Sequence, residues 1–226
     1  MKLTIFATFR NRFMHFLSPL LENYIADNSQ EEPEVLKELT RETHLKVLRP
    51  RMITGHFQGR VLSMLSKIVN PATILEIGTY TGYSAICLAE GLRKDGKLHT
   101  IDINEELYDI QQRYFQKSGF APQIVQHIGD ALDIIPTLDT VFDLVFIDAE
   151  KTSYDEYFES VIPKTRPGGI ILSDNVLWSG KVVEPLDIKD KATESLLKYN
   201  TKLKEDPRVE TVLLPIRDGL TLSRVL

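Results

Sequence analysis

The sequence predicts an α/β fold: a Rossmann-like, doubly wound, mostly parallel seven-stranded sheet with an antiparallel C-terminal hairpin and a helical N-terminal region. From Ile74 onward, short β-rich runs alternate with segments of helical periodicity, which is the pattern of successive βαβ units. The last two β-rich runs are separated by a turn that contains Asp218 and Gly219, a dipeptide typical of β-hairpins. A length of 226 residues suits one domain, so we expect a single domain over residues 1–226.

The chain before the sheet is predicted to be helical. Residues 17–70 show helical patterns that are interrupted at Pro33 and Pro50, and a helix is expected from His56 to Val69. We therefore expect residues 1–40 to form a helical N-terminal extension.

The first residues raise the question of export. Residues 1–9 resemble the apolar part of a signal peptide, but arginines follow directly at positions 10 and 12 and no small-residue cleavage site is present. Export is therefore not expected. Met14 offers a second plausible start, so residues 1–13 are expected to contribute little to the fold.

The remaining elements follow the βαβ alternation. Strands are expected at 74–77, 97–103, 124–128, 142–147, 170–173, 209–215 and 220–226. Helices are expected at 83–92, 105–117, 153–162 and 192–204, with a short helix after the third strand.

Composition excludes several classes of protein. The net charge of -5 provides no basic field for a nucleic-acid backbone, so no nucleic-acid partner is expected. Cys87 is the single cysteine, which rules out an intrachain disulfide and fits a reducing cytoplasm; it is expected to be an inert core residue. No run of about 18 apolar residues occurs, so no membrane span is expected. These features predict a soluble cytoplasmic protein.

Acidic residues stand at the ends of the predicted parallel strands, where open α/β sheets bind their ligands. One such acid alone is most simply a helix cap or a solvated loop residue. Five in the same register predict a binding site, and they are Glu76, Asp102, Asp130, Asp148 and Asp174.

A glycine loop follows the first strand, with Gly78 and Gly82 separated by three residues. Glycine lets a ligand approach the backbone closely. The spacing lacks the G-x-G-x-x-G pattern of dinucleotide folds, and Glu76 beside the loop would repel a pyrophosphate. S-adenosylmethionine carries no phosphate and bears two cationic groups, and Asp102 at the end of the second strand can bind its ribose diol. The sequence therefore favours S-adenosylmethionine as the cofactor.

A second cluster combines Asp148 with Asp174 and Asn175 at the ends of adjacent strands. Two carboxylates and an amide oxygen form the hard-oxygen ligand set that Mg²⁺ or Ca²⁺ prefers. The alternative is a hydrogen-bonded loop anchor without a metal. Lys151 lies three residues after Asp148, and from composition alone it is most simply a solvated lysine.

Six separated motifs, in order, resemble one enzyme family. They occupy residues 75–85, 101–102, 129–131, 142–151, 174–180 and 214–220. Together they resemble the small metal-dependent class I S-adenosylmethionine O-methyltransferases, the catechol and caffeoyl-CoA O-methyltransferase family, over roughly residues 40–226. Two departures are evident: Glu150 stands where the family often has Asp, and the segment before residue 40 has no match. Because that segment helps to select the acceptor in the family, the acceptor stays open.

The resemblance implies a role for each site residue. Lys151 is the catalytic base beside Asp148, while Asp148, Asp174 and Asn175 are the metal ligands. The cofactor contacts are expected to be Met52, Thr54, Glu76, Gly78, Tyr80, Gly82, Ser84, Asp102, Asp130, Ala131 and Asp148. A homodimer is also implied.

The expected reaction is methyl transfer to a small hydroxylated aromatic. A divalent cation binds two adjacent oxygens of a catechol-like or caffeoyl-type acceptor, Lys151 removes a proton, and the oxyanion attacks the sulfonium methyl group. Three neighbouring residues allow two interpretations: Trp178 is a substrate wall or core, His56 contacts substrate or only lies near the entrance, and Tyr83 shapes the pocket or packs under a helix. Two other functions remain alternatives, a nicotinamide-dependent oxidoreductase and a non-catalytic small-molecule binding module.

Overall fold

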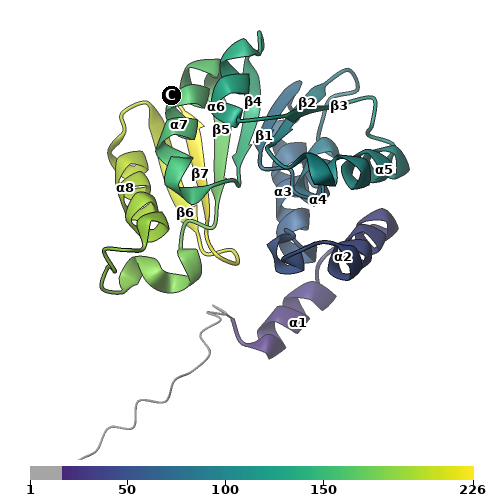
Figure 1. Ribbon diagram of the computed structural model, residues 1–226, viewed down its shortest axis with the longest axis horizontal. Helices are drawn as coiled ribbons and strands as arrows, with labels where there is room; N and C mark the ends of the chain where they lie inside the picture. The colour runs from purple at the N-terminus through teal and green to yellow at the C-terminus, as the bar shows by residue number, and fades with distance from the viewer. Residues whose placement is uncertain (1–16) are drawn as a thin grey trace, which may run out of the picture.

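A computed structural model describes residues 17–226. A seven-stranded sheet with strand order β3-β2-β1-β4-β5-β7-β6 forms its centre (Figure 1). The strands are β1 (Thr73–Ile77), β2 (Lys97–Asp102), β3 (Ile124–Ile128), β4 (Phe142–Ile147), β5 (Thr165–Asp174), β6 (Val209–Leu214) and β7 (Leu220–Val225). Strands β1 to β5 pair in parallel, and β7 pairs antiparallel with both β5 and β6. The predicted sheet and its C-terminal hairpin are confirmed.

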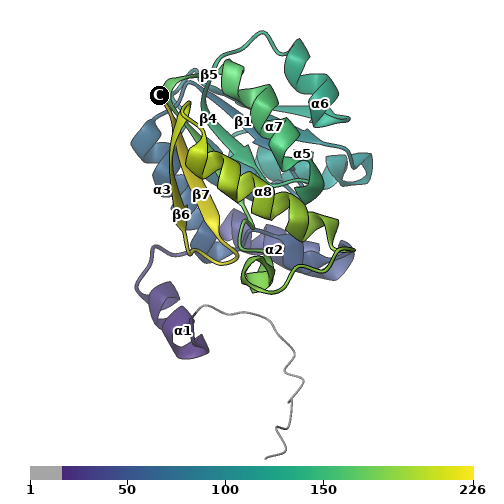
Figure 2. The ribbon, with the colours of Figure 1, turned by 90° about the vertical axis from the view of Figure 1, so that its left-hand side faces the viewer.

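Helices cover both faces of the sheet, as Figure 1 and Figure 2 show. One face carries α3 (His56–Val69), α4 (Tyr83–Ala89) and α5 (Tyr108–Ser118), and the other carries α6 (Ala131–Ile134), α7 (Tyr154–Val161) and α8 (Lys191–Glu205). Such parallel βαβ connections place successive strands side by side. The strand order reverses between β1 and β4, and this is the switch point at which open α/β sheets bind ligands.

The core divides into two layers because successive residues of a strand point to opposite faces. Ile74 and Leu144 belong to the cluster under α3, α4 and α5, whereas their neighbours Leu75 and Val145 belong to the cluster under α7 and α8. All six residues of β4 are buried, as expected for the central strand of a sheet that is covered on both faces.

The N-terminal region is helical, with breaks near the predicted prolines. It consists of α1 (Pro19–Asp27), α2 (Glu34–Lys46) and the 3₁₀ turn η1 (Pro50–Met52), followed by α3. Helix α1 begins after Ser18, whose hydroxyl accepts from the N–H of Leu21, and it buries none of its residues. The expectation for residues 1–13 lies outside the described residues. No helix within residues 17–226 is long and apolar enough to cross a membrane.

Several element boundaries differ from the prediction, and the start of β5 and the end of α4 are among the larger differences. Strand β5 begins at residue 165, because Thr165 pairs with Phe142 before the register shifts and Ile170 pairs with Leu144. Helix α4 ends at Ala89 instead of residue 92. The chain turns there because Gly91 lies against α3: a Cβ on Gly91 would come within 2.3 Å of the Ser66 backbone.

Candidate functional site

The carboxyl ends of four strands meet at one level. Ile77 of β1 pairs with both Ile101 of β2 and Ile147 of β4, and Ile147 pairs with Ser173 of β5. The residues that follow these positions are Gly78, Asp102, Asp148 and Asp174, so the register brings them to the same edge of the sheet. The prediction that acids from separate strands converge at this edge is therefore confirmed by the register for these three aspartates.

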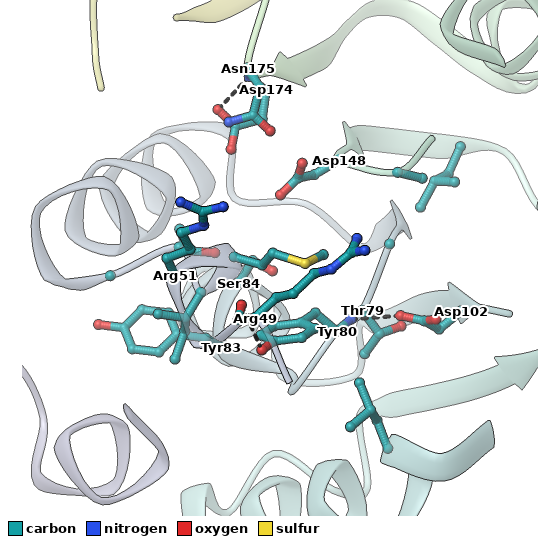
Figure 3. Close-up of a pocket in the computed structure, with 18 of the residues that line it drawn as sticks. Arg49, Arg51, Thr79, Tyr80, Tyr83, Ser84, Asp102, Asp148, Asp174 and Asn175 are labelled. Carbon is teal, nitrogen blue, oxygen red and sulfur yellow. Dashed lines mark hydrogen bonds between the residues drawn. The ribbon is translucent and has the colours of Figure 1, made fainter. Parts of the chain in front are cut away.

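A cavity of about 2070 Å³ opens at this edge. Single drug-sized ligands occupy pockets of about 300–1,000 Å³, so this volume suits two molecules bound together. Figure 3 shows Asp102 on one side of the cavity and Asp174 with Asn175 on another, with Asp148 between them. Of the predicted site residues, the cavity wall includes Met52, Thr54, Gly78, Tyr80, Ser84, Asp102, Asp130, Ala131, Asp148, Lys151, Asp174 and Asn175.

Asp102 is held by backbone groups on both of its oxygens. Oδ2 accepts from the N–H of Tyr80 at 2.7 Å, and Oδ1 accepts from the N–H of Asn104 at 2.8 Å. Tyr80 takes a left-handed backbone conformation with φ 48° at the tip of the glycine loop. Its hydroxyl donates to the carbonyl oxygens of Leu48 at 3.1 Å and Arg49 at 3.3 Å. The glycine loop, Asp102 and the segment at residues 48–54 are thus fixed to one another.

The two glycines of the loop are required by protein packing. Gly78 has φ +100°, and a Cβ there would lie 2.1 Å from the carbonyl oxygen of Asp148. Gly82 has φ +90°, and a Cβ there would lie 2.6 Å from the ring of Phe115. Close approach of a ligand is the reason predicted from the sequence for these glycines, whereas in the structure protein atoms already fill the space next to both.

Glu76 lies beneath the cavity instead of on its wall. Its side chain is fully buried on the face of β1 that carries α4, and it accepts from the Thr100 hydroxyl at 2.5 Å. Burial raises the pKa of Glu76 to about 8, against the lowering effect of hydrogen bonds from Ser84 and Thr100. At neutral pH Glu76 therefore holds its proton. Neither Glu76 nor Gly82 reaches the wall that the structure describes.

Asp130 and Ala131 bring the third strand to the cavity. Asp130 is the N-cap of α6, with Oδ1 accepting from the N–H of Leu132 at 2.9 Å, and Ala131 is buried beside it. The helix-cap alternative for this acid is correct, and Asp130 also lines the cavity.

Asp148, Asp174 and Asn175 form the oxygen-rich part of the site (Figure 3). Asp174 is 3% exposed, and its pKa is raised to about 7 by burial first and then by the charge of Asp148, while Lys151 acts in the opposite direction. The N–H of Asn175 donates to Asp174 Oδ1 at 2.8 Å, and Asn175 has φ 57°. Within residues 17–226 no three His, Cys, Asp or Glu side chains gather as a metal site.

Lys151 is buried beside this set and is not a solvated lysine. Its side chain is 7% exposed, and Nζ donates to Asp148 Oδ1 at 2.9 Å and to the Tyr154 hydroxyl at 2.7 Å. The Tyr154 hydroxyl in turn donates to the carbonyl oxygen of Asp174 at 2.9 Å. Tyr154 was not singled out from the sequence, although its position three residues after Lys151 on a helical start is the signal that pairs them.

Arg217 fixes the cavity entrance and was also missed. Its Nη1 donates to the carbonyl oxygens of Thr54 and Ile53 and, at 3.3 Å, to Oε1 of Gln58. Thr54 is buried, whereas Met52 is 55% exposed on the cavity side. The β6–β7 turn therefore anchors the segment that carries two of the predicted cofactor residues.

The residues that allowed two interpretations now have definite surroundings. Trp178 packs against the core under α8 and also lines the cavity. Tyr83 is buried at the start of α4, with its hydroxyl donating to Glu32 at 2.5 Å, and it also lines the cavity. His56 forms a hydrogen bond with the carbonyl oxygen of Gln30 at 2.7 Å. Cys87 is fully buried, and burial raises its pKa to about 12, which confirms an inert core thiol.

Comparison with known proteins points to one family. The family model described as O-methyltransferase matches residues 26–226. Caffeoyl-CoA O-methyltransferase 5 of Nicotiana tabacum is 37% identical, with 92% of this chain and 91% of that protein covered. Caffeoyl-CoA O-methyltransferase 2 of Petunia hybrida is 39% identical over 92% of this chain and 90% of its own length.

Solved structures agree with these relatives. The O-methyltransferase from Bacillus cereus, in complex with SAH, superposes with a TM-score of 0.85 at 28% identity and covers 92% of this chain and 97% of its own. The O-methyltransferase TomG from Streptomyces achromogenes, in complex with SAM, has a TM-score of 0.83 at 32% identity, with 91% and 96% covered. With the family model spanning most of the chain, and with curated relatives above 30% identity, the chain belongs to the O-methyltransferase family.

Proposed function

We propose that this O-methyltransferase transfers the methyl group of S-adenosylmethionine to a hydroxyl of a catechol-like or caffeoyl-type aromatic that is chelated by a divalent cation. The observation that carries the proposal is the placement of buried Lys151 in contact with Asp148, one strand away from Asp174. The ligands named in two similar structures, SAM and SAH, support the cofactor. The names of the curated relatives support a caffeoyl-type acceptor.

The cofactor is proposed to lie over the glycine loop. Asp102 binds the ribose diol, since its carboxylate is oriented by two backbone N–H groups at the end of β2. The cationic ammonium and sulfonium groups then lie toward Asp148, on the acidic floor of the cavity. The other contacts proposed are Met52, Thr54, Gly78, Tyr80, Ser84, Asp130 and Ala131. Glu76 instead lies beneath the loop, and Gly82 lies against the Phe115 ring.

The donor set fits a hard divalent cation. Asp148 and Asp174 are neighbouring acids, and burial first and then the charge of Asp148 raise the pKa of Asp174. Lys151 is the one cation bonded to this pair among the described residues. A cation held by Asp148, Asp174 and Asn175 would neutralise this excess negative charge with oxygen ligands. When bound, Mg²⁺ or Ca²⁺ lowers the pKa of a coordinated hydroxyl.

Lys151 is proposed to accept the hydroxyl proton at Nζ. Its side chain is fixed by Asp148 on one side and the Tyr154 hydroxyl on the other, so the amine cannot swing into solvent without breaking both contacts. The acceptor oxygen then attacks the methyl carbon as the carbon–sulfur bond breaks, giving methylated product and S-adenosylhomocysteine. Holding the two reactants at the edge of one rigid sheet supplies a large share of the rate enhancement.

The proposal is tested by mass spectrometry of a panel of catechol and caffeoyl acceptors incubated with S-adenosylmethionine. Monomethylated products are expected from vicinal diphenols, with loss of product in chelator and recovery on addition of magnesium. Absence of turnover with every vicinal diphenol would favour a non-catalytic binding module. Tight binding of NAD without binding of S-adenosylmethionine would favour an oxidoreductase.

Assembly is proposed to be a homodimer of single-domain subunits in the cytoplasm. This proposal rests on the family resemblance, and analytical ultracentrifugation of the full chain tests the dimer. A monomer across the micromolar range would contradict it.

A further inference from the structure

The cations on the cavity wall divide into two groups. Four have partners among residues 17–226: Lys46 and Arg113 bond to Glu42, Lys151 to Asp148, and Arg217 to main-chain carbonyl oxygens. The other two are Arg49 and Arg51, whose guanidinium groups form no ion pair or hydrogen bond with any residue that the structure describes. Two guanidinium groups without a partner among residues 17–226 therefore border a site whose floor is acidic.

The segment that carries these arginines is fixed in place. Arg49 has a left-handed backbone with φ 56°, which is uncommon for a residue with a side chain. The Tyr80 hydroxyl donates to the carbonyl oxygens of Leu48 and Arg49, and the N–H of Met52 donates to the Arg49 carbonyl oxygen at 2.9 Å. Arg217 fixes the far end of the segment at Ile53 and Thr54. The segment thus presents its side chains to the cavity from a defined backbone.

The two arginines face different parts of the cavity. In Figure 3 the Arg51 side chain extends toward the side that carries Asp174 and Asn175, whereas Arg49 extends over the glycine loop on the side of Tyr80 and Thr79. The first side is the acceptor side under the proposed function, and the second is the cofactor side. S-adenosylmethionine offers its ammonium and sulfonium groups to the acidic floor, and Arg49 is the guanidinium on the side where its one carboxylate would lie. Arg51 is therefore left facing the acceptor.

We propose that Arg51 is a specificity-determining residue that binds an anionic substituent, a carboxylate or a phosphate, on the hydroxylated aromatic acceptor. A guanidinium forms short, charge-assisted and often bidentate hydrogen bonds with either group, and neither group could bind well to the acidic floor. The inference rests on the proposed function for the position of the acceptor. It adds that the enzyme prefers acidic acceptors to neutral ones.

Caffeate and its methyl ester form a matched pair of acceptors that differ in one negative charge. The wild-type enzyme is expected to use caffeate with a lower KM than methyl caffeate. In Arg51→Gln the KM for caffeate should rise about tenfold, the loss of one charge-assisted hydrogen bond, while the KM for methyl caffeate stays unchanged. Caffeoyl-CoA is the second anionic probe: selective loss with caffeoyl-CoA alone identifies a phosphate as the group bound, and selective loss with caffeate identifies a carboxylate.

Two control variants remove the same charge elsewhere. Arg49→Gln removes a charge two residues away, and Arg41→Gln removes one from the exposed face of α2, outside the cavity. Neither should alter the ratio of KM values for the matched acceptors. An equal effect of Arg49→Gln and Arg51→Gln would show a general electrostatic field and overturn the assignment, as would equal loss with the acid and the ester. A fall in S-adenosylmethionine affinity in Arg51→Gln would also overturn it, since Arg51 would then bind the cofactor.

Measurements of acceptor binding distinguish a failure of this inference from a failure of the proposed function. Calorimetry of caffeate and methyl caffeate with the enzyme and S-adenosylhomocysteine requires no turnover. If neither compound is methylated but caffeate still binds through Arg51, the methylation proposal fails and the anion site stands. If both are methylated without preference for the acid, and Arg51→Gln also leaves the KM for caffeoyl-CoA unchanged, the methylation proposal stands and the anion site fails.

Discussion

The guanidinium of Arg217 donates to the main-chain carbonyl oxygen of Thr54, and so joins the last hairpin of the sheet to the entrance of the cavity. Arg217 does so from a left-handed backbone with φ 47°, a conformation that glycine adopts at lower cost. The hydrogen bond therefore offsets the local backbone strain. Replacing Arg217 with glycine removes both, so the effect of the bond on cofactor binding can be measured separately from its effect on stability.

Arg217→Gly should leave the free energy of unfolding within about 1 kcal/mol of wild type, because relief of backbone strain offsets the lost hydrogen bonds. Its affinity for S-adenosylmethionine should fall about tenfold as the segment that carries Met52 and Thr54 loosens, an effect equal to one hydrogen bond. Urea unfolding and calorimetry measure the two quantities. Arg224→Ala, an exposed arginine on β7, is the control, and unchanged cofactor affinity in Arg217→Gly would show that the tether has no part in binding.

Asp102→Ala should weaken S-adenosylmethionine binding by roughly 1–3 kcal/mol, because the ribose hydroxyls and the N–H groups of Tyr80 and Asn104 lose their acceptor. Calorimetry measures the change. Asp139→Ala, an exposed acid outside the cavity, serves as the control. Equal affinities in wild type and Asp102→Ala would remove Asp102 from the cofactor site.

Lys151→Met should reduce turnover by about 10²-fold or more, the usual scale for loss of a general base. Methionine fills the apolar length of the buried side chain, so the fold and cofactor affinity should persist. Steady-state kinetics at neutral pH, with calorimetry of the cofactor as the control, provide the measurement. Near-normal turnover would mean that the acceptor loses its proton without Lys151.

Asp174→Ala should abolish methylation even in excess magnesium, because it removes a charged ligand, whereas Asn175→Ala should be partly rescued by higher metal concentration. Cofactor affinity should survive in both, since the proposed cofactor contacts lie on the other side of the cavity. Elemental analysis of the bound metal accompanies the kinetic assay. Full activity in chelator, with metal shown to be absent, would reduce Asp148, Asp174 and Asn175 to a structural role.

Glu76 should make the fold less stable as pH rises. The unfolded chain releases this proton near pH 4.5, whereas the folded protein retains it until about pH 8, so the unfolded state is favoured progressively between these values. Glu76→Gln keeps the shape without the titration, and it should remove on the order of 3 kcal/mol of that pH-dependent loss. Urea unfolding of both proteins at pH 5.5 and pH 8 checks the difference. Parallel pH profiles would show that Glu76 is already ionised in the folded state.

The fold was predictable because each strand carries its own local signal. Strands β3 and β4 begin and end at the predicted residues, and α3 spans the predicted range from His56 to Val69. The early start of β5 was not predictable, since Arg166 to Gly169 is typical of a turn. Only the pairing of Thr165 with Phe142 makes this segment part of the strand.

The site was predictable where strand register alone decides the outcome. Asp148 and Asp174 follow paired residues, so their proximity follows from two parallel strands. Alternate residues of β1 point to opposite faces of the sheet, and no motif in the sequence determines on which face Glu76 lies. The Arg217–Thr54 bond joins residues 163 positions apart, and no local pattern indicates a contact at that separation. Long-range hydrogen bonds of this kind required the folded structure.

The contact between Gly78 and the carbonyl oxygen of Asp148 limits how this enzyme could be redesigned. The turn that would carry the methyl donor and the aspartate that would face the acceptor share one backbone junction, with no room for a side chain between them. A variant that shifts either element to admit a different acceptor would displace the donor by a similar amount. Acceptor range is therefore most readily altered through the side chains of residues 49–52 and of the loop around Trp178, which can be exchanged without moving that junction.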